Sequence, residues 1–110
     1  MSNVLDFGKV DGIVVDKSDN TLVLLVIDQL PWDSARHEYE HLLLLEKKLN
    51  AYVVFIQKGL YKKTYPAREF EKFRIEVSLK NVCTSKGKEF FARASKKLEP
   101  LNIDLKYKQY

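Results

Sequence analysis

The sequence predicts an α+β fold in which two helices pack on one face of a mainly antiparallel four-stranded sheet, in the chain order ββαβαβ. Three observations predict it. Two aliphatic segments near the N-terminus are separated by a short turn, a long segment with helical periodicity follows, and two alternating segments enclose a second helical one. The 110 residues, 45% of them hydrophobic, suffice for one compact domain spanning residues 1–110.

The first two strands are predicted as a hairpin. Residues 10–16 and 21–28 are rich in β-branched and aliphatic side chains, and residues 17–20 between them have turn chemistry. The second segment is apolar almost without interruption, which favours a central strand with both faces covered.

A long helix is predicted from about Ser34 to Lys58. Pro31 ends the extended run, Asp33 or Ser34 supplies a capping oxygen, and Gly59 suits the left-handed position after the helix. The apolar stripe expected to face the sheet comprises Leu42, Leu45, Leu49, Tyr52, Val53 and Ile56.

Leu44 and Phe55 lie on another side of this helix. Either the second helix and the connection at 61–66 cover them, or this side meets another chain, a second copy included. The two residues are therefore candidates for an interface.

The C-terminal half supplies a strand, a helix and a strand. Residues 73–80 alternate strictly between apolar and polar, Thr84 or Ser85 can cap a helix that Pro100 ends, and the alternation resumes from Ile103. This half is basic, and the open face of the sheet is expected to present four cationic side chains that complete the candidate interface: Arg74, Lys80, Lys106 and Lys108.

Composition favours a cytoplasmic protein. No stretch of about 18 apolar residues could span a bilayer, and residues 1–6 lack the features of a signal peptide. The single cysteine, Cys83, allows no internal disulfide and is interpreted as a small buried residue.

Residues 37–41 read His-Glu-Tyr-Glu-His, which matches the zinc-protease motif H-E-x-x-H. The surroundings argue against zinc, because Leu44 and Lys47 stand where an extended motif needs glycine and histidine, and the chain has no third histidine. We therefore interpret the match as a coincidence and predict neither a bound metal nor a cofactor.

No nucleotide-binding or nucleophile-elbow motif occurs, so no catalytic residue is assigned and a non-enzymatic role is preferred. Two alternatives stay open. One is a hydrolase that uses Asp28, Asp33 and His41. The other is a nucleic-acid-binding protein that uses the basic sheet face, although no RNA-binding signature supports it.

Three segments carry a family resemblance: Val10-Asp11-x-Ile13, Asp28-x-Leu30-x-Trp32-Asp33, and a helix segment that begins at Glu40-His41-Leu42, continues through Lys48-Leu49-Asn50-Ala51-Tyr52 and closes with Phe55-Ile56-x-x-Gly59. On these residues the chain resembles an uncharacterised family of small bacterial proteins known only as a domain of unknown function. The resemblance covers most of the chain and is strongest from Val10 to Gly59. Its pattern includes His41 but not His37, which further weakens the zinc interpretation.

The resemblance implies no established activity. It does imply a set of positions that form a local polar network at the strand-to-helix junction or a binding surface, namely Asp28, Trp32, Asp33, His41, Asn50 and Tyr52.

The preferred function is binding of another protein. Small size, the lack of a catalytic set, and surplus apolar and basic surface lead to one concrete hypothesis, an immunity or inhibitor protein that occludes the active site of a toxin domain.

Overall fold

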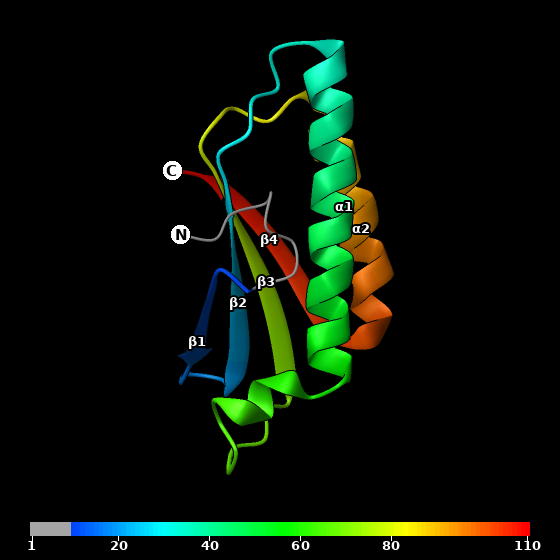
Figure 1. Ribbon diagram of the computed structural model, residues 1–110. Helices are drawn as coiled ribbons and strands as arrows, with labels where there is room; N and C mark the ends of the chain where they lie inside the picture. The colour runs from blue at the N-terminus through cyan, green and yellow to red at the C-terminus, as the bar shows by residue number, and fades with distance from the viewer. Residues whose placement is uncertain (1–9) are drawn as a thin grey trace.

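A computed structural model describes residues 10–110, which form a four-stranded sheet and two helices (Figure 1). Residues 1–9, on which the expected lack of a signal peptide rests, lie outside the described residues. The elements are β1 (Gly12–Asp16), β2 (Thr21–Asp28), α1 (Ala35–Gln57), η1 (Leu60–Lys63), β3 (Lys72–Leu79), α2 (Ser85–Leu98), η2 (Glu99–Leu101) and β4 (Ile103–Gln109). The predicted order ββαβαβ is confirmed.

The expectation of a mainly antiparallel sheet is wrong. The strands lie in the order β1-β2-β3-β4, and only β1 and β2 are antiparallel, whereas β2-β3 and β3-β4 are parallel. The physical reason is the helix that follows each of β2 and β3. The 23 residues of α1 span about 35 Å, enough to carry the chain back along the full length of β2, so the next strand starts at the same end as the last.

The helix ends follow the predicted chemistry. The side chain of Ser34 accepts a hydrogen bond from the backbone N–H of His37 at 3.1 Å, and Thr84 caps Gly87 in the same way at 3.2 Å. After α1, Gly59 adopts the left-handed conformation with φ 66°. The prediction of both helices and of their caps is therefore confirmed.

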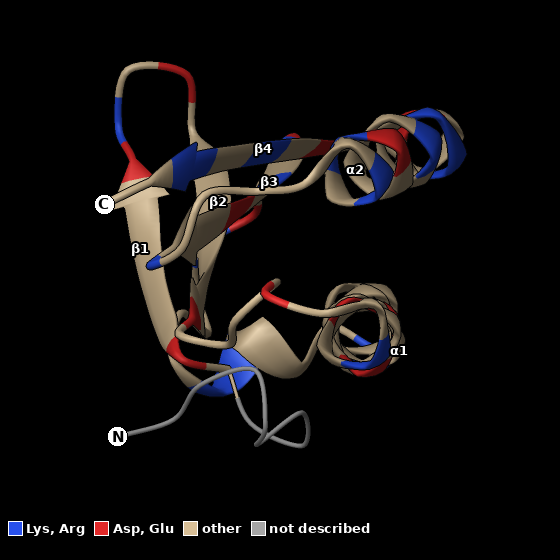
Figure 2. Cartoon of the chain, turned by 90° about the horizontal axis from the view of Figure 1, so that it is seen from above, with Lys and Arg blue, Asp and Glu red and all other residues tan. Residues whose placement is uncertain are grey.

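Both helices cover one face of the sheet, and the core lies between the two layers (Figure 2). On this face the register aligns Leu24 of β2 with Ile75 of β3 and Leu105 of β4, all buried. Phe91 of α2 stacks on Tyr107 of β4, with ring centroids 4.3 Å apart. Among residues 10–110, no helix is long and apolar enough to cross a membrane.

The first strand is shorter than predicted. It begins at Gly12 instead of Val10, because Asp11 bonds outside the sheet ladder. Its N–H donates to the hydroxyl of Tyr52 at 2.8 Å, and its carboxylate accepts the N–H of Ile27 at 2.8 Å.

We expect Gly59→Ala to lower the free energy of unfolding by about 1 kcal/mol, because an L side chain is strained at positive φ. Urea denaturation followed by circular dichroism measures the change. Gly59→Asn is the matched control and should lose less, since asparagine tolerates this conformation. Equal losses for the two variants would contradict the argument.

Candidate functional site

The carboxyl ends of the three parallel strands meet at one edge of the sheet, next to the start of both helices (Figure 1). In open sheets of this kind, ligand sites lie at such an edge. Asp28 is the last residue of β2 at this edge, and its backbone carbonyl accepts the N–H of Lys80 at 2.8 Å. A ligand site in a fold of this kind is therefore expected at this edge.

Asp28 forms a buried pair with His41 in the second turn of α1. The His41 Nε2 contacts the Asp28 Oδ2, and each residue is only 1% exposed. The other ring nitrogen, Nδ1, donates to the backbone carbonyl of Pro31 at 3.2 Å, and the ring of Trp32 stacks on the imidazole with centroids 3.7 Å apart. We call Asp28, Pro31, Trp32 and His41 the junction cluster.

The hydrogen bonds of the junction cluster indicate a structural role. A histidine that acts as a general base needs one ring nitrogen free to face its substrate. Both nitrogens of His41 are engaged inside the fold, and the second carboxylate oxygen of Asp28 accepts the N–H of Leu30 at 3.0 Å. The cluster therefore ties the β2–α1 loop to α1.

Asp33 does not join this cluster. It is exposed and lies 2.5 Å from the Nδ1 of His37, and that hydrogen bond lowers the pKa of the Asp33 carboxyl. The hydrolase alternative required Asp28, Asp33 and His41 in one site, but Asp33 lies apart from the other two.

The two histidines of the H-E-x-x-H string face different carboxylates, His37 facing Asp33 and His41 facing Asp28. No group of metal-binding side chains occurs within residues 10–110.

Cys83 lies near the junction cluster as a packing residue. Gly87 of α2 leaves the space that Cys83 and Trp32 fill, because a side chain at position 87 would meet both. Burial raises the pKa of the Cys83 thiol, which keeps it in its protonated, poorly nucleophilic form.

A second buried network lies two helical turns further along α1. The Lys48 Nζ bonds the Asp11 Oδ1 at 2.8 Å, and both side chains are fully buried. The hydroxyl of Tyr52 accepts the Asp11 N–H and donates to the carbonyl of Leu25 at 2.6 Å. Burial, with the nearby Asp11 carboxylate, raises the pKa of the Tyr52 phenol above its usual range.

Sequence reasoning missed Asp11 and Lys48 as members of this network. A signal was present, because Lys48 follows Leu45 by three residues and precedes Tyr52 by four, which places it in the sheet-facing stripe. A lysine there must bury its charge against a partner. Tyr52 was predicted as a site residue but belongs to this second network.

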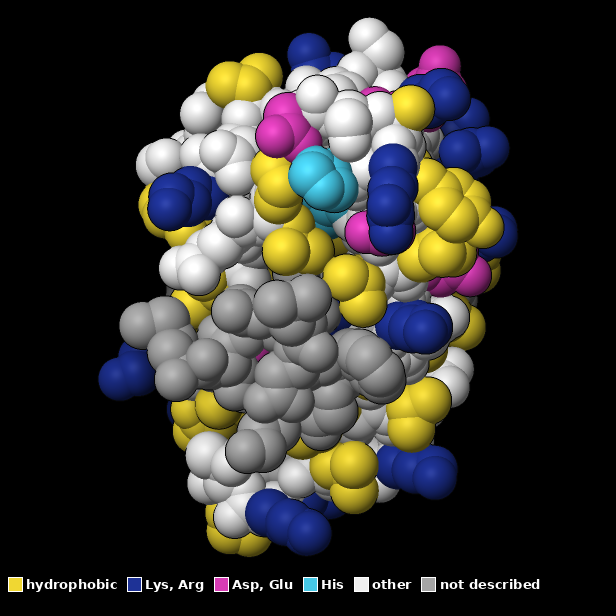
Figure 3. All heavy atoms as spheres, turned by 45° about the horizontal axis from the view of Figure 1, so that its top comes forward, with side chains coloured by type: hydrophobic (Ala, Val, Ile, Leu, Met, Phe, Trp, Pro, Cys, Tyr) yellow, Lys and Arg dark blue, Asp and Glu magenta, His cyan; other side chains and the backbone are white. Residues whose placement is uncertain are grey.

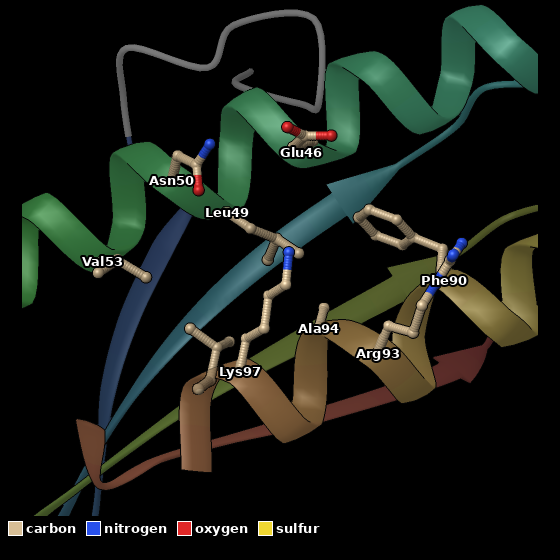
Figure 4. Close-up of a pocket in the computed structure, with 9 residues that line it drawn as sticks. Glu46, Leu49, Asn50, Val53, Phe90, Arg93, Ala94 and Lys97 are labelled. Carbon is tan, nitrogen blue, oxygen red and sulfur yellow. The ribbon is translucent and has the colours of Figure 1, made fainter. Parts of the chain in front are cut away.

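A groove of about 380 Å³ lies elsewhere, between α1 and α2 (Figure 4). Its apolar walls are Leu49 and Val53 from α1 and Phe90, Ala94 and Leu98 from α2. Its rims are polar, with Glu46 and Asn50 on α1 facing Arg93 and Lys97 on α2. Asn50 therefore lies at this groove, far along α1 from the junction cluster.

The remaining predicted interface residues do not form one surface. Leu44 and Phe55 are half-buried and pack against the core in the helix layer. Arg74 lies on the opposite face of the sheet, with Lys106 and Lys108, and Lys80 is exposed just past β3. Arg74 is paired there with Asp16 at 2.8 Å and lies near Glu76.

The chain belongs to a protein family: the family of unknown function DUF6572 matches residues 1–110. This confirms the resemblance to an uncharacterised family. Neither the curated proteins nor the solved structures contain a match to the chain.

We expect Asp28→Asn to lower the free energy of unfolding by about 3 kcal/mol, because it removes one partner of a buried pair. Urea denaturation measures the loss. Asp33→Asn is the matched control, since it breaks an exposed pair of the same two residue types, and its denaturation midpoint should stay at the wild-type value. Equal shifts would show that burial of the pair is unimportant.

We expect Tyr52→Phe to lower the free energy of unfolding by about 1–2 kcal/mol near neutral pH, because two part-buried backbone groups lose their partner. The deficit should shrink above about pH 10. There the phenol of the unfolded chain loses its proton while the buried phenol keeps it, so the wild type loses stability as the pH rises.

Denaturation of both proteins from about pH 8 to about pH 11 tests this. Tyr39→Phe is the control, because Tyr39 is 66% exposed and this variant should follow the wild type throughout. A deficit that stays constant with pH would contradict the assignment.

Proposed function

We propose that this member of the family of unknown function is a protein-binding module and that the groove between α1 and α2 is its binding surface. The observation that carries the proposal is a groove with apolar walls and charged rims. Among the described residues, no ion pair joins Glu46 on one rim to Arg93 or Lys97 on the other. Apolar walls with unpaired rim charges are the anatomy of a protein interface.

Exposed apolar side chains beside the groove support the proposal. Leu43 and Val54 of α1 are 41% and 43% exposed. They lie on one strip of the helix with Asn50, because spacings of seven and four residues return to the same side. A partner seated in the groove would cover this strip as well, so the apolar surface available to it extends beyond the groove itself.

Nucleic-acid binding is less well supported. The open face of the sheet carries both signs of charge: the cations are Lys72, Arg74, Lys106 and Lys108, and the carboxylates are Asp16, Glu76 and Asp104. Arg74 is already paired with Asp16. On the face that Figure 3 shows, Lys and Arg side chains are scattered among apolar and uncharged ones. A nucleic-acid surface needs a continuous basic patch. The immunity or inhibitor role stays a prediction that no observation tests.

Photo-cross-linking tests the binding surface. p-Benzoylphenylalanine replaces Asn50 on the groove rim in one variant and Lys106 on the sheet face in the control, because both side chains are exposed. We expect Asn50 to yield an adduct with a second protein in cells that encode the chain, and Lys106 to yield none. The captured protein is then purified and titrated against the unmodified chain.

Two groove variants complete the test. Ala94→Glu places a charge on the apolar wall, and Asn50→Arg changes only an exposed rim residue, so at least one of them should fold normally. We expect each folded variant to bind the purified partner at least tenfold more weakly. Capture only at Lys106, capture of a second copy of the chain, or wild-type affinity in the groove variants would overturn the proposal.

A further inference from the structure

We infer that the segment bound in the groove is an acidic amphipathic helix whose carboxylates face α2. The inference rests on the proposed function, since it names the partner segment for the same groove. Three features of the groove carry it: the spacing of its apolar walls, the charge of its two rims, and its concave shape.

The walls have the spacing of a helix-binding groove. Leu49 and Val53 repeat at four residues on α1, and Phe90, Ala94 and Leu98 repeat at four on α2. Rows of this spacing form ridges, and the side chains of a third helix can pack into the grooves beside them. The volume of about 380 Å³ lies at the small end of ligand pockets, which run from about 300 to about 1,000 Å³. It suits a few apolar side chains in a row.

The two rims differ in charge. Arg93 and Lys97 are four residues apart, so they lie on the same side of α2, one turn from each other. Figure 4 shows both rising from α2 toward α1, with Lys97 extending toward Leu49. The α1 rim has instead one carboxylate, Glu46, and the amide of Asn50.

This asymmetry fixes the chemistry and the orientation of the occupant. Two carboxylates one turn apart on the bound helix would match Arg93 and Lys97, and the flank facing Glu46 would be neutral or basic.

The concave shape favours a helix over a lipid surface. Leu49 and Leu98 at the bottom of the groove are buried, whereas the rim residues Glu46, Arg93 and Lys97 are exposed. A flat bilayer would meet the charged rims before the apolar walls. A single helix is narrow enough to enter between them and to place its own apolar ridge on the walls.

Selection from a display library tests the inference without the native partner. The library consists of 18-residue helical peptides with one face randomised, and it is selected on the wild-type chain and on two double variants. Arg93→Glu with Lys97→Glu reverses the groove rim. Lys88→Glu with Lys96→Glu makes the same charge change on the same helix, at exposed positions outside the groove.

We expect the wild type to enrich peptides with an apolar ridge and two acidic residues four apart, and the rim variant to enrich lysine or arginine there. The control variant should enrich the same peptides as the wild type. The best wild-type peptide should bind the rim variant at least tenfold more weakly and the control variant within threefold. NMR shifts should map it to Leu49, Val53 and Ala94.

Four outcomes would overturn the inference. The first two are no enrichment of a helical acidic pattern and an equal loss of peptide affinity in both double variants. The other two are NMR shifts outside the groove and binding of the wild type to phosphatidylglycerol vesicles that the peptide fails to displace. An Asn50 cross-link to a partner together with any of these outcomes would reject the acidic helix alone. Absence of that cross-link rejects the proposed function itself, whatever the peptides do.

Discussion

The contact between His41 and Asp28 fixes the first turns of α1 against the carboxyl end of β2, and much of the architecture follows from it. Seven residues later, Lys48 reaches Asp11 beside the start of β1. Because seven residues are close to two helical turns, both anchors lie on the same face of α1. A purely apolar stripe would let the helix slide along the sheet more easily. Directional polar bonds at two points prevent this sliding.

The groove is a consequence of how the two helices are held. Polar anchors attach α1 to β2 and to Asp11, whereas α2 is attached to β4 through the stacking of Phe91 on Tyr107. The strand β3 lies between these two strands. Each helix is therefore positioned by a different strand. The two helices do not close against each other at Leu49, Val53 and Ala94, which line the groove.

The H-E-x-x-H string shows how a catalytic pattern can serve a structural purpose. Its spacing does place two histidines near one helical face, but His41 turns inward to Asp28 and His37 turns outward to Asp33. The same two residue types thus form one buried pair and one exposed pair within a single helix start. Burial is what distinguishes them, and burial follows from which side of α1 the sheet occupies.

The candidate site was predictable in part. Asp28, Trp32 and His41 were expected at the strand-to-helix junction and do meet there. Asp33 and Asn50 lie elsewhere, because the pattern that grouped them carries no information about side-chain direction. The groove was not predicted, since its walls come from two different helices, α1 and α2, and the distance between helices is a tertiary property.

The sequence by itself determined the elements of this protein: their order, the caps at Ser34 and Thr84, and the left-handed Gly59. These depend on backbone conformation and on side-chain periodicity, which are local. Only the tertiary structure decided strand direction, the pairing of Lys48 with Asp11, and the groove. Each of these depends on which distant segments share a side of the sheet, and local physics leaves that choice open.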